Sequence, residues 1–436
     1  MKTTGPRSIT RRSLLAGAAG ALAAPMVSPS ASAQTPTKIN IFAHRVHRTV
    51  AVGTQGGDIT AEWSRRTGVA VEWTTFDTGP LQERLFREAS LSETSVDIGF
   101  VLNTQAVPRT ANLFEPLEAL MRAEPVEDVP DIFPGMIQGL TIGGQLYGLP
   151  FRHSSSGMHY NTELFAERGI SGPPRTIEEF AEVAKRMSYT RANGTPVVGL
   201  VLDGVNYPNV IDIARAWDGE YITPDMRVVA NQAPMVRAVT LLRELFVAGA
   251  FPRNFSTIRT EDVNTWMQTG RGAMGISGMG RNRIFNDPQA SQFAGKITTT
   301  TIPVSRELQG RFEVAPAKVE FWGMAIPRTS RNKQLAWSLM REMTSKANTL
   351  KAALNGNGPV RNSTYDDPRV RAALPYAEDE RKVLRVARVP MPAFDEAQRA
   401  ADFFREEAES AVLGMKTPQK AMDDLTARVR RLLGQN

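Results

Sequence analysis

The stretch Gly143–Phe165, GGQLYGLPFRHSSSGMHYNTELF, does not have the pattern of a single structural element. A glycine pair and a short apolar run lead into Pro150. Arg152, His153 and three consecutive serines follow, and a helix is expected only after Tyr160 and Asn161. Many hydrogen-bonding groups therefore lie between two apolar segments, and the fold must give them partners because unpaired buried polar groups are costly.

Strands and helices alternate in the residues before this stretch. Buried or alternating apolar runs predict strands at 38–43, 69–73 and 96–102. Apolar residues at helical spacing predict helices at 56–67 and 79–90 between them. This alternation indicates an α/β sheet with right-handed crossovers.

A well-marked helix follows the opening stretch, within PPRTIEEFAEVAKRM (173–187). Thr176 and Glu179 predict a capping box at its start, ahead of a stripe of apolar residues. Further helices are expected at about 234–248, 332–353, 395–413 and 418–433, the last with Thr417 as its cap and Pro418 at its first position.

The first residues have the pattern of an export signal of the twin-arginine type. Four basic residues precede an apolar run from Leu14 to Val27, and Ala31–Ala33 offers a cleavage site, so we expect a signal peptide at 1–33. An uncleaved anchor is the alternative, but the run is short for a membrane span. No cysteine follows it to carry a lipid.

The composition of the chain excludes several classes of protein and of binding site. The chain of 436 residues has no cysteine, which excludes disulfides and thiol metal sites. Removing the four basic residues of the signal leaves 48 Lys and Arg against 45 Asp and Glu, a net charge of +3 instead of +7. The charges are dispersed, so no nucleic-acid partner is expected. About 400 mature residues indicate two domains.

The order of these segments resembles the family 1 extracellular solute-binding proteins, the receptor subunits of bacterial ABC importers, often for sugars. The resemblance covers nearly all of the mature chain, and it is strongest in five segments taken together. They are GQLYGLPFRHSSSGMHYNTELFAERGISGPPRTIEEF (144–180), GRGAMGISGMGR (270–281), FWGMAIPRTSRNKQLAWSLMREMTS (321–345), NGPVR (357–361) and VLGMKTPQKAMDDL (412–425).

The resemblance implies a two-lobe periplasmic-binding-protein fold of type II, with the ligand cleft between lobes joined by crossing strands. It places 34–152 with 324–374 in an N-terminal lobe and 153–318 with 375–436 in a C-terminal lobe. The crossings fall at about 153–157 and 319–323. The serines then lie where the chain passes between lobes, and short crossing segments absorb the hinge motion.

The resemblance also implies a function. We expect a monomeric periplasmic receptor that captures a small polar solute, a carbohydrate such as a monosaccharide, polyol or sugar derivative, and delivers it to an inner-membrane ABC permease. Segments that converge on the cleft supply the candidate ligand-binding residues. These are His44, Arg45, Asn103, Gln105, Arg152, His153, Ser154, Ser155, Tyr207, Trp217, Gly278, Met279, Arg281, Trp322 and Arg361.

The candidates contain fewer aromatic residues and more arginines than sugar-binding members of the family. Because a guanidinium pairs well with carboxylate or phosphate, a sugar acid or glycerol phosphate is the alternative ligand, bound by Arg45, Arg152, Arg281 or Arg361. The four histidines fall in two segments without a dependable acidic partner, so neither a metal nor a cofactor is expected.

Two other classes remain open. A periplasmic carbohydrate-active hydrolase or lyase needs a positioned nucleophile and base. His153 beside three serines suggests one superficially, but no nucleophile-elbow glycine pattern surrounds them, so we expect no enzyme. The third class is a sensor that uses the same fold to dock on a receptor kinase.

Overall fold

The computed structural model describes residues 37–435, so the predicted signal peptide at 1–33 lies outside the described residues. Within this part, nine strands form one mixed sheet in the order β2-β1-β3-β11-β6-β9-β8-β7, with β10 also paired to β6. The strands are β1 (Lys38–His44), β2 (Ala70–Phe76), β3 (Ile98–Leu102), β6 (Leu149–Asn161), β7 (Tyr189–Thr190), β8 (Pro196–Val201), β9 (Gly272–Gly278), β10 (Ile297–Thr300) and β11 (Val319–Ala325), and a separate hairpin pairs β4 (Thr141–Ile142) with β5 (Gln145–Leu146).

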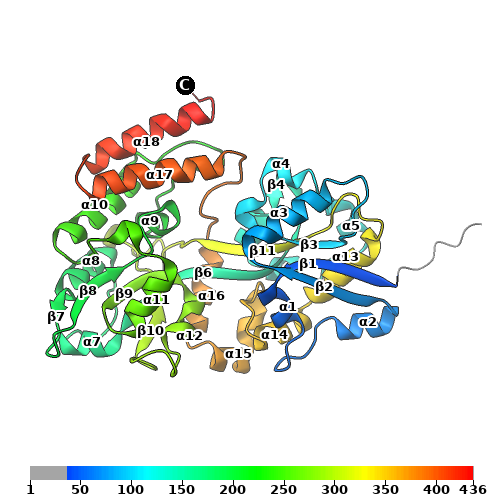
Figure 1. Ribbon diagram of the computed structural model, residues 1–436, viewed down its shortest axis with the longest axis horizontal. Helices are drawn as coiled ribbons and strands as arrows, with labels where there is room; N and C mark the ends of the chain where they lie inside the picture. Colours follow the sequence, from blue (N-terminus) through cyan, green and yellow to red (C-terminus); the bar gives the residue numbers. More distant parts are fainter. Residues whose placement is uncertain (1–36, 436) are drawn as a thin grey trace, which may run out of the picture. The chain divides into compact units, whose positions relative to one another are not determined.

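Helices cover the sheet and fill the connections between strands (Figure 1). Their bounds are α1 (Arg45–Ala51), α2 (Ala61–Thr67), α3 (Thr78–Ala89), α4 (Pro108–Ala111), α5 (Glu118–Ala123), α6 (Pro134–Gln138), α7 (Thr162–Glu167), α8 (Ile177–Arg186), α9 (Tyr207–Ala214), α10 (Ala233–Val247), α11 (Thr260–Gln268), α12 (Asn282–Phe285), α13 (Lys333–Met343), α14 (Lys346–Leu354), α15 (Pro368–Ala373), α16 (Ala377–Val386), α17 (Ala397–Val412) and α18 (Pro418–Leu432). Short 3-10 turns include η1 (Asn103–Gln105), η3 (Arg215–Trp217), η5 (Met279–Arg281) and η7 (Asn362–Asp366). No helix in this described part is long and apolar enough to cross a membrane.

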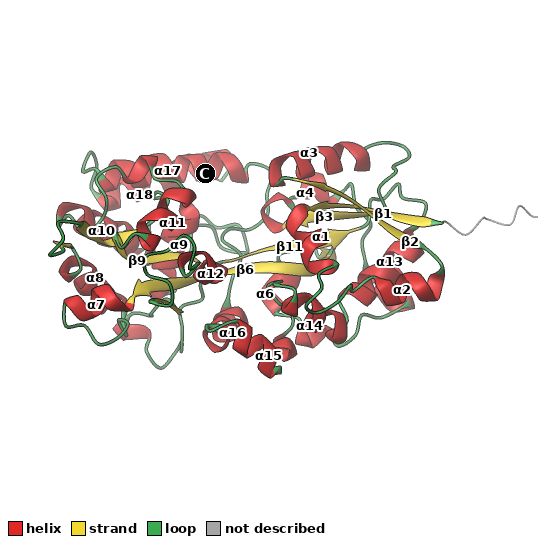
Figure 2. Cartoon of the chain, turned by 60° about the horizontal axis from the view of Figure 1, so that its bottom comes forward, coloured by secondary structure: helices red, strands yellow, loops and turns green. Residues whose placement is uncertain are grey.

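Strand β6 belongs to both halves of the sheet. Its first part, Leu149–Ser155, pairs antiparallel with β11, which in turn pairs with β3. Its second part, Ser156–Tyr160, pairs with β9, and Met158–Asn161 pairs with β10. Figure 2 shows β6 and β11 extending side by side between the two groups of helices. The stretch that opened the sequence is thus one long strand, and its polar residues lie where its pairing partner changes.

The strand predictions at 38–43, 69–73 and 96–102 are confirmed, as β1, β2 and β3. The helix predicted at 79–90 is confirmed as α3, but the one at 56–67 is wrong in its first five residues, because α2 begins at Ala61. Gly56 accounts for the difference. Its backbone N–H donates to Asn355 Oδ1 at 2.7 Å, and a Cβ built there would lie 1.9 Å from the Lys351 carbonyl, so the chain at this point lies flat against α14.

Residues 332–353, predicted as one helix, form two helices, α13 and α14. The break lies at Thr344 and Ser345. Ser345 caps α14, because its side chain accepts a hydrogen bond from the Asn348 N–H, and the Thr344 carbonyl accepts one from Arg361 Nε at 2.8 Å. Both bonds use backbone groups that helix ends leave unpaired.

The predicted start of α8 is confirmed with one change. Thr176 Oγ1 accepts from the Glu179 N–H at 3.1 Å, as a capping residue should. The Glu179 carboxylate accepts in return from the N–H of Arg175 at 2.8 Å, one residue before the cap, and not from Thr176 itself. The helices at 234–248, 395–413 and 418–433 are confirmed as α10, α17 and α18, the last capped by Thr417.

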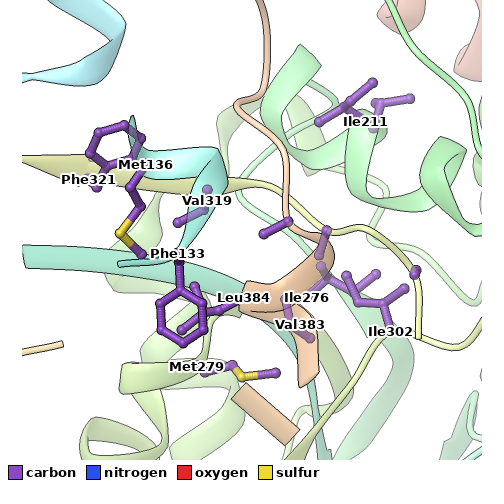
Figure 3. Packing of buried hydrophobic residues seen from close by; sticks show 14 of the residues in the cluster. Phe133, Met136, Ile211, Ile276, Met279, Ile302, Val319, Phe321, Val383 and Leu384 are labelled. Carbon is purple, nitrogen blue, oxygen red and sulfur yellow. The ribbon is translucent and has the colours of Figure 1, made fainter. Parts of the chain in front are cut away.

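One face of the β6–β11 pair is covered by apolar side chains (Figure 3). Val319 and Phe321 on β11 are buried together with residues of α6 and α16, among them Met136 and Leu384. Burial of this apolar area fixes which side of each crossing strand faces inward. The lobe boundaries proposed above stay predictions.

Candidate functional site

The two crossing strands present different residues on their two faces. In the antiparallel register Trp322 lies opposite Arg152, and Glu320 lies opposite Ser154. Side chains alternate along a strand, so these four residues share one face. All four are exposed or partly exposed, whereas the residues between them are buried. We name this set, Arg152, Ser154, Glu320 and Trp322, the crossing face.

The predicted candidates His153 and Ser155 point to the opposite, buried face, so their assignment to the ligand site is wrong. Ser155 Oγ donates to Glu380 Oε1 at 2.9 Å, and Tyr365 Oη donates to Glu380 Oε2 at 2.8 Å. His153 Nε2 lies 3.3 Å from the same Tyr365 hydroxyl. Arg152–Ser155 was predicted as one group of ligand contacts, but strand alternation divides these residues between the two faces.

Burial perturbs the ionisation of this inner cluster. It lowers the pKa of His153 to about 3, with a further lowering by the nearby Arg152 charge. It raises the pKa of Glu380 to about 7, although hydrogen bonds from Tyr365 and Ser155 and the Arg152 charge act in the opposite direction. The cluster ties α16 and the 357–365 segment to β6.

The N-terminal end of α1 lies next to Trp322. His44 caps this helix: its Nδ1 accepts from the Val46 N–H at 3.2 Å, and His47 Nδ1 accepts from the His44 N–H at 3.2 Å. The Trp322 ring lies 4.8 Å from the His47 ring and 6.3 Å from the His44 ring, centroid to centroid. Trp322 therefore packs on α1 while part of it stays exposed.

His44 offers a donor beside this tryptophan. Burial lowers its pKa; Asp77 partly opposes this, and the Arg152 and Arg45 charges add to it. Because Nδ1 already accepts a hydrogen bond, the neutral ring carries its proton on Nε2. Nε2 makes no hydrogen bond to any described residue.

Arg152 and Glu320 have no partner among residues 37–435. Neither side chain makes a hydrogen bond or an ion pair to any other residue in this range, although each is partly buried. Burial lowers the pKa of Arg152, and nearby Tyr376 and Glu380 counteract it. Unpaired polar groups that are partly desolvated are costly unless another molecule completes their bonds. This makes the crossing face the strongest candidate for a binding site.

Glu320 was not predicted from the sequence. Its signal is the alternation in VEFWG (319–323), where one charged residue stands between two buried apolar ones and shares its face with Trp322. Burial raises the pKa of the Tyr207 phenol, and the charge of Glu320 raises it further. This indicates that Glu320 lies near Tyr207, at the start of α9.

The structure also brings Gly278 to the crossing face. A Cβ added at Gly278 would lie 2.4 Å from Ser154 Oγ, so any larger residue there would displace the Ser154 hydroxyl. Arg281, on η5, donates to Asn264 Oδ1 at 3.0 Å and is partly buried. Asp203, another residue that sequence reasoning missed, lies near Arg281 and Lys318 and accepts hydrogen bonds from Asn209 and Thr260.

Other candidates lie at the edge of the site. Arg45 is exposed and forms an ion pair with Asp77 at 3.4 Å. Gln105 is exposed at the end of η1. Asn103 is buried, and its Oδ1 accepts from the Phe321 N–H at 3.0 Å, which indicates that it holds β11 against η1. Trp217 is partly buried against the core, and its role stays a prediction.

Two further candidates, Arg361 and Met279, are wrong. Arg361 has no exposed surface, and its guanidinium donates to the carbonyls of Thr344, Asp128 and Glu127, so it has no group left for a ligand. Met279 is also fully buried.

No cluster of three or more His, Cys, Asp or Glu suited to a metal ion occurs in the described residues. A cavity of about 430 Å³ lies elsewhere, lined by Pro174, Thr300, Phe312 and neighbours, all between residues 173 and 313. It contains none of the predicted site residues, and nothing from α1 or β11 reaches it.

Comparison with known proteins agrees with this arrangement of two sheet halves around shared crossing strands. Residues 57–350 match the family model described as bacterial extracellular solute-binding protein. The chain belongs to this family. Its members are solute-binding receptors. A probable ABC transporter-binding protein of Deinococcus radiodurans is 24% identical over 324 residues, which is 72% of this chain and 76% of that protein.

Solved structures share the two-lobe fold. The sugar-binding protein MalE of Xanthomonas citri matches with a TM-score of 0.76 and 20% identity, covering 91% of this chain and 98% of that one. An ABC transporter solute-binding protein of Agrobacterium radiobacter K84, in complex with ribitol, matches with a TM-score of 0.69 and 23% identity, covering 91% and 100%. The predicted fold class is confirmed.

Proposed function

We propose that this protein is a periplasmic receptor that binds a small polyhydroxylated solute at the crossing face, closes around it and hands it to an inner-membrane ABC permease. One observation carries the proposal. An exposed part of Trp322 lies beside two charged groups that have no partner within residues 37–435, on the strands that join the two halves of the sheet.

The chemistry of the crossing face suits a carbohydrate. An aromatic ring face packs against the C–H groups of a sugar or polyol, while fixed donors and acceptors around it select hydroxyl positions. Trp322 supplies the ring, Arg152 and His44 supply donors, and Glu320 supplies an acceptor. The ribitol bound by the Agrobacterium radiobacter protein, which shares the fold, supports a solute of this class.

The arrangement around the three serines argues against the hydrolase or lyase alternative. A serine nucleophile needs an imidazole within hydrogen-bond reach and access to substrate. Ser155 is fully buried and bonds to the Glu380 carboxylate, while the His153 ring bonds to Tyr365. Ser154, the exposed one, makes no hydrogen bond to another described side chain.

The test is a thermal-shift and calorimetric screen of the purified protein against sugars, polyols, sugar acids and glycerol phosphates. A solute at 100 times its Kd should raise the free energy of unfolding by about 2.7 kcal/mol. We expect a neutral sugar or polyol to bind, and nuclear magnetic resonance to find it chemically unchanged. Trp322→Ala should weaken binding at least tenfold, and Trp322→Phe should restore most of it. Failure of every carbohydrate to bind, or the appearance of a product, would exclude the proposed function.

A further inference from the structure

We propose that Glu320, together with Arg152, restricts this site to uncharged solutes with neighbouring hydroxyl groups and rejects the corresponding acids. The inference rests on the receptor function proposed above and adds to it the charge of the solute and the residue that selects it.

The geometry places an anion and a cation on one surface without joining them. Arg152 is opposite Trp322 and Glu320 is opposite Ser154, so the two charged residues are diagonal neighbours on adjacent strands. Both have long side chains, yet no ion pair within 4.0 Å joins them, and neither pairs with any other residue from 37 to 435. Each charged group can therefore bind to a solute.

The two charges act on different neighbours, although the Arg152 charge also interacts with Tyr376 and Glu380 at α16. The Arg152 charge lowers the pKa of His44 and adds to the strong lowering that burial imposes on His47, so the guanidinium lies close to α1. The Glu320 charge contributes to the raised pKa of Tyr207, so the carboxylate lies close to the start of α9. A solute that rests on Trp322 between them would meet a donor on one side and an acceptor on the other.

The other three arginines that had suggested an anionic solute each have a partner in the protein. Arg361 is buried among backbone carbonyls, Arg45 pairs with Asp77, and Arg281 bonds to Asn264. Among these four, only Arg152 makes no hydrogen bond or ion pair to a residue between 37 and 435, and within the same range Glu320 makes none either. The net charge offered by the crossing face is therefore zero, not positive.

Hydroxyl groups satisfy both charges at once, because each hydroxyl both donates and accepts a hydrogen bond. A guanidinium donates in a planar fork that matches two neighbouring oxygens, and a carboxylate accepts two O–H groups. A sugar acid would pair its carboxylate with Arg152 but bring a like charge towards Glu320, which disfavours binding. The exposed Ser154 hydroxyl and the His44 Nε2–H add neutral partners that suit hydroxyl groups.

A calorimetric comparison of matched pairs tests this directly. The probes are ribitol with ribonate, D-mannitol with D-mannonate and D-glucose with D-gluconate. Each is titrated into wild type, Glu320→Gln and Arg152→Gln. The control variant is Glu72→Gln, which removes an exposed carboxylate on β2. Circular dichroism checks that each variant is folded.

Wild type should bind at least one neutral member ten times or more tighter than its acid. Glu320→Gln should reduce this preference at least tenfold, Arg152→Gln should weaken neutral and acidic members alike, and Glu72→Gln should match wild type.

Three results would overturn the inference while leaving the receptor function intact. One is a wild-type preference for the acid. The second is an unchanged preference in Glu320→Gln. The third is tighter binding of a zwitterionic amino acid, such as glycine or serine, than of any neutral carbohydrate through the same two residues. If no carbohydrate of either kind binds wild type, the proposed function fails, and the inference fails with it.

Discussion

At the scale of single residues, the ionisable groups of the crossing strands divide by face. Arg152 and Glu320 make no hydrogen bond or ion pair to another residue between 37 and 435, while His153 and Glu380 are held in a buried hydrogen-bonded chain with Ser155 and Tyr365. The buried chain has consequences for stability that do not depend on any ligand.

Glu380 should make stability fall as pH rises. Its pKa is about 7 in the folded protein, against an ordinary value of 4.5, so the folded state holds more protons than the unfolded state between these values. The free energy of unfolding therefore decreases through this window, by at most about 3 kcal/mol. Glu380→Gln should remove this part of the pH dependence and be the more stable form at pH 8.

Urea unfolding of wild type and Glu380→Gln at pH 5, 6, 7 and 8 measures this effect. The difference in unfolding free energy between the two proteins at each pH isolates Glu380, because both contain the same other titrating groups, including the buried histidines. Glu378→Gln, on the same helix with an exposed side chain, is the control and should parallel wild type. Parallel curves for wild type and Glu380→Gln would contradict the assignment.

Arg361 should be a stabilising residue and not a ligand contact. Arg361→Met leaves the buried Thr344 carbonyl and the partly buried Asp128 and Glu127 carbonyls without their donor, so we expect a loss of about 3–5 kcal/mol in urea unfolding. Arg369→Met, which removes an exposed guanidinium, should change stability by less than about 1 kcal/mol. A small loss for Arg361→Met, accompanied by weaker solute binding, would return Arg361 to the site.

At the scale of elements, close approaches between helices and strands depend on particular glycines. A Cβ at Gly199 on β8 would lie 1.8 Å from the Ala184 carbonyl of α8, and the backbone atom cannot move aside as a side chain would. Gly199→Ala should therefore cost about 1–3 kcal/mol. Gly79→Ala, in α3 where nothing lies within 4 Å of the added carbon, should be neutral or stabilising by up to about 1 kcal/mol. Thermal unfolding of both variants measures the contrast, and equal effects would contradict it.

The local sequence pattern was sufficient to predict most of the helices and strands. The periodicity of β1, β2 and β3 and the caps of α8 and α18 lie within a few consecutive residues, so the sequence indicates them directly. The break between α13 and α14 and the late start of α2 depend on contacts with Arg361 and Asn355, which are distant in sequence. Neither is visible in a local pattern.

The site was predictable in part for the same reason. The crossing strand itself was recognisable, but the side that Arg152, His153 and Ser155 face depends on which side α6 and α16 cover. Applying period-two alternation to both crossings would have excluded His153 and Ser155 and added Glu320.

At the scale of the molecule, one strand serves both halves of the sheet. β6 has 13 residues, a length of about 40 Å, and exchanges β11 for β9 and β10 midway along it. We expect a hinge motion to pass through this exchange point and through β11.

Closure around a solute should be measurable in solution. We expect small-angle scattering to give a smaller radius of gyration for the purified protein at saturating solute than without it. Trp322→Ala at the same solute concentration should show less of this change, because less of the protein is bound. An unchanged radius in wild type, with binding verified by calorimetry, would contradict hinge closure.

A crystal structure of the protein with the neutral carbohydrate that binds most tightly in the screen tests the proposed binding site directly. We predict an intact solute packed on Trp322, with hydroxyl groups bonded to both Arg152 and Glu320 and with contacts from both halves of the sheet. A solute located elsewhere, such as the cavity beside Pro174 and Phe312, or one bound without contact to Trp322 and Glu320, would contradict it.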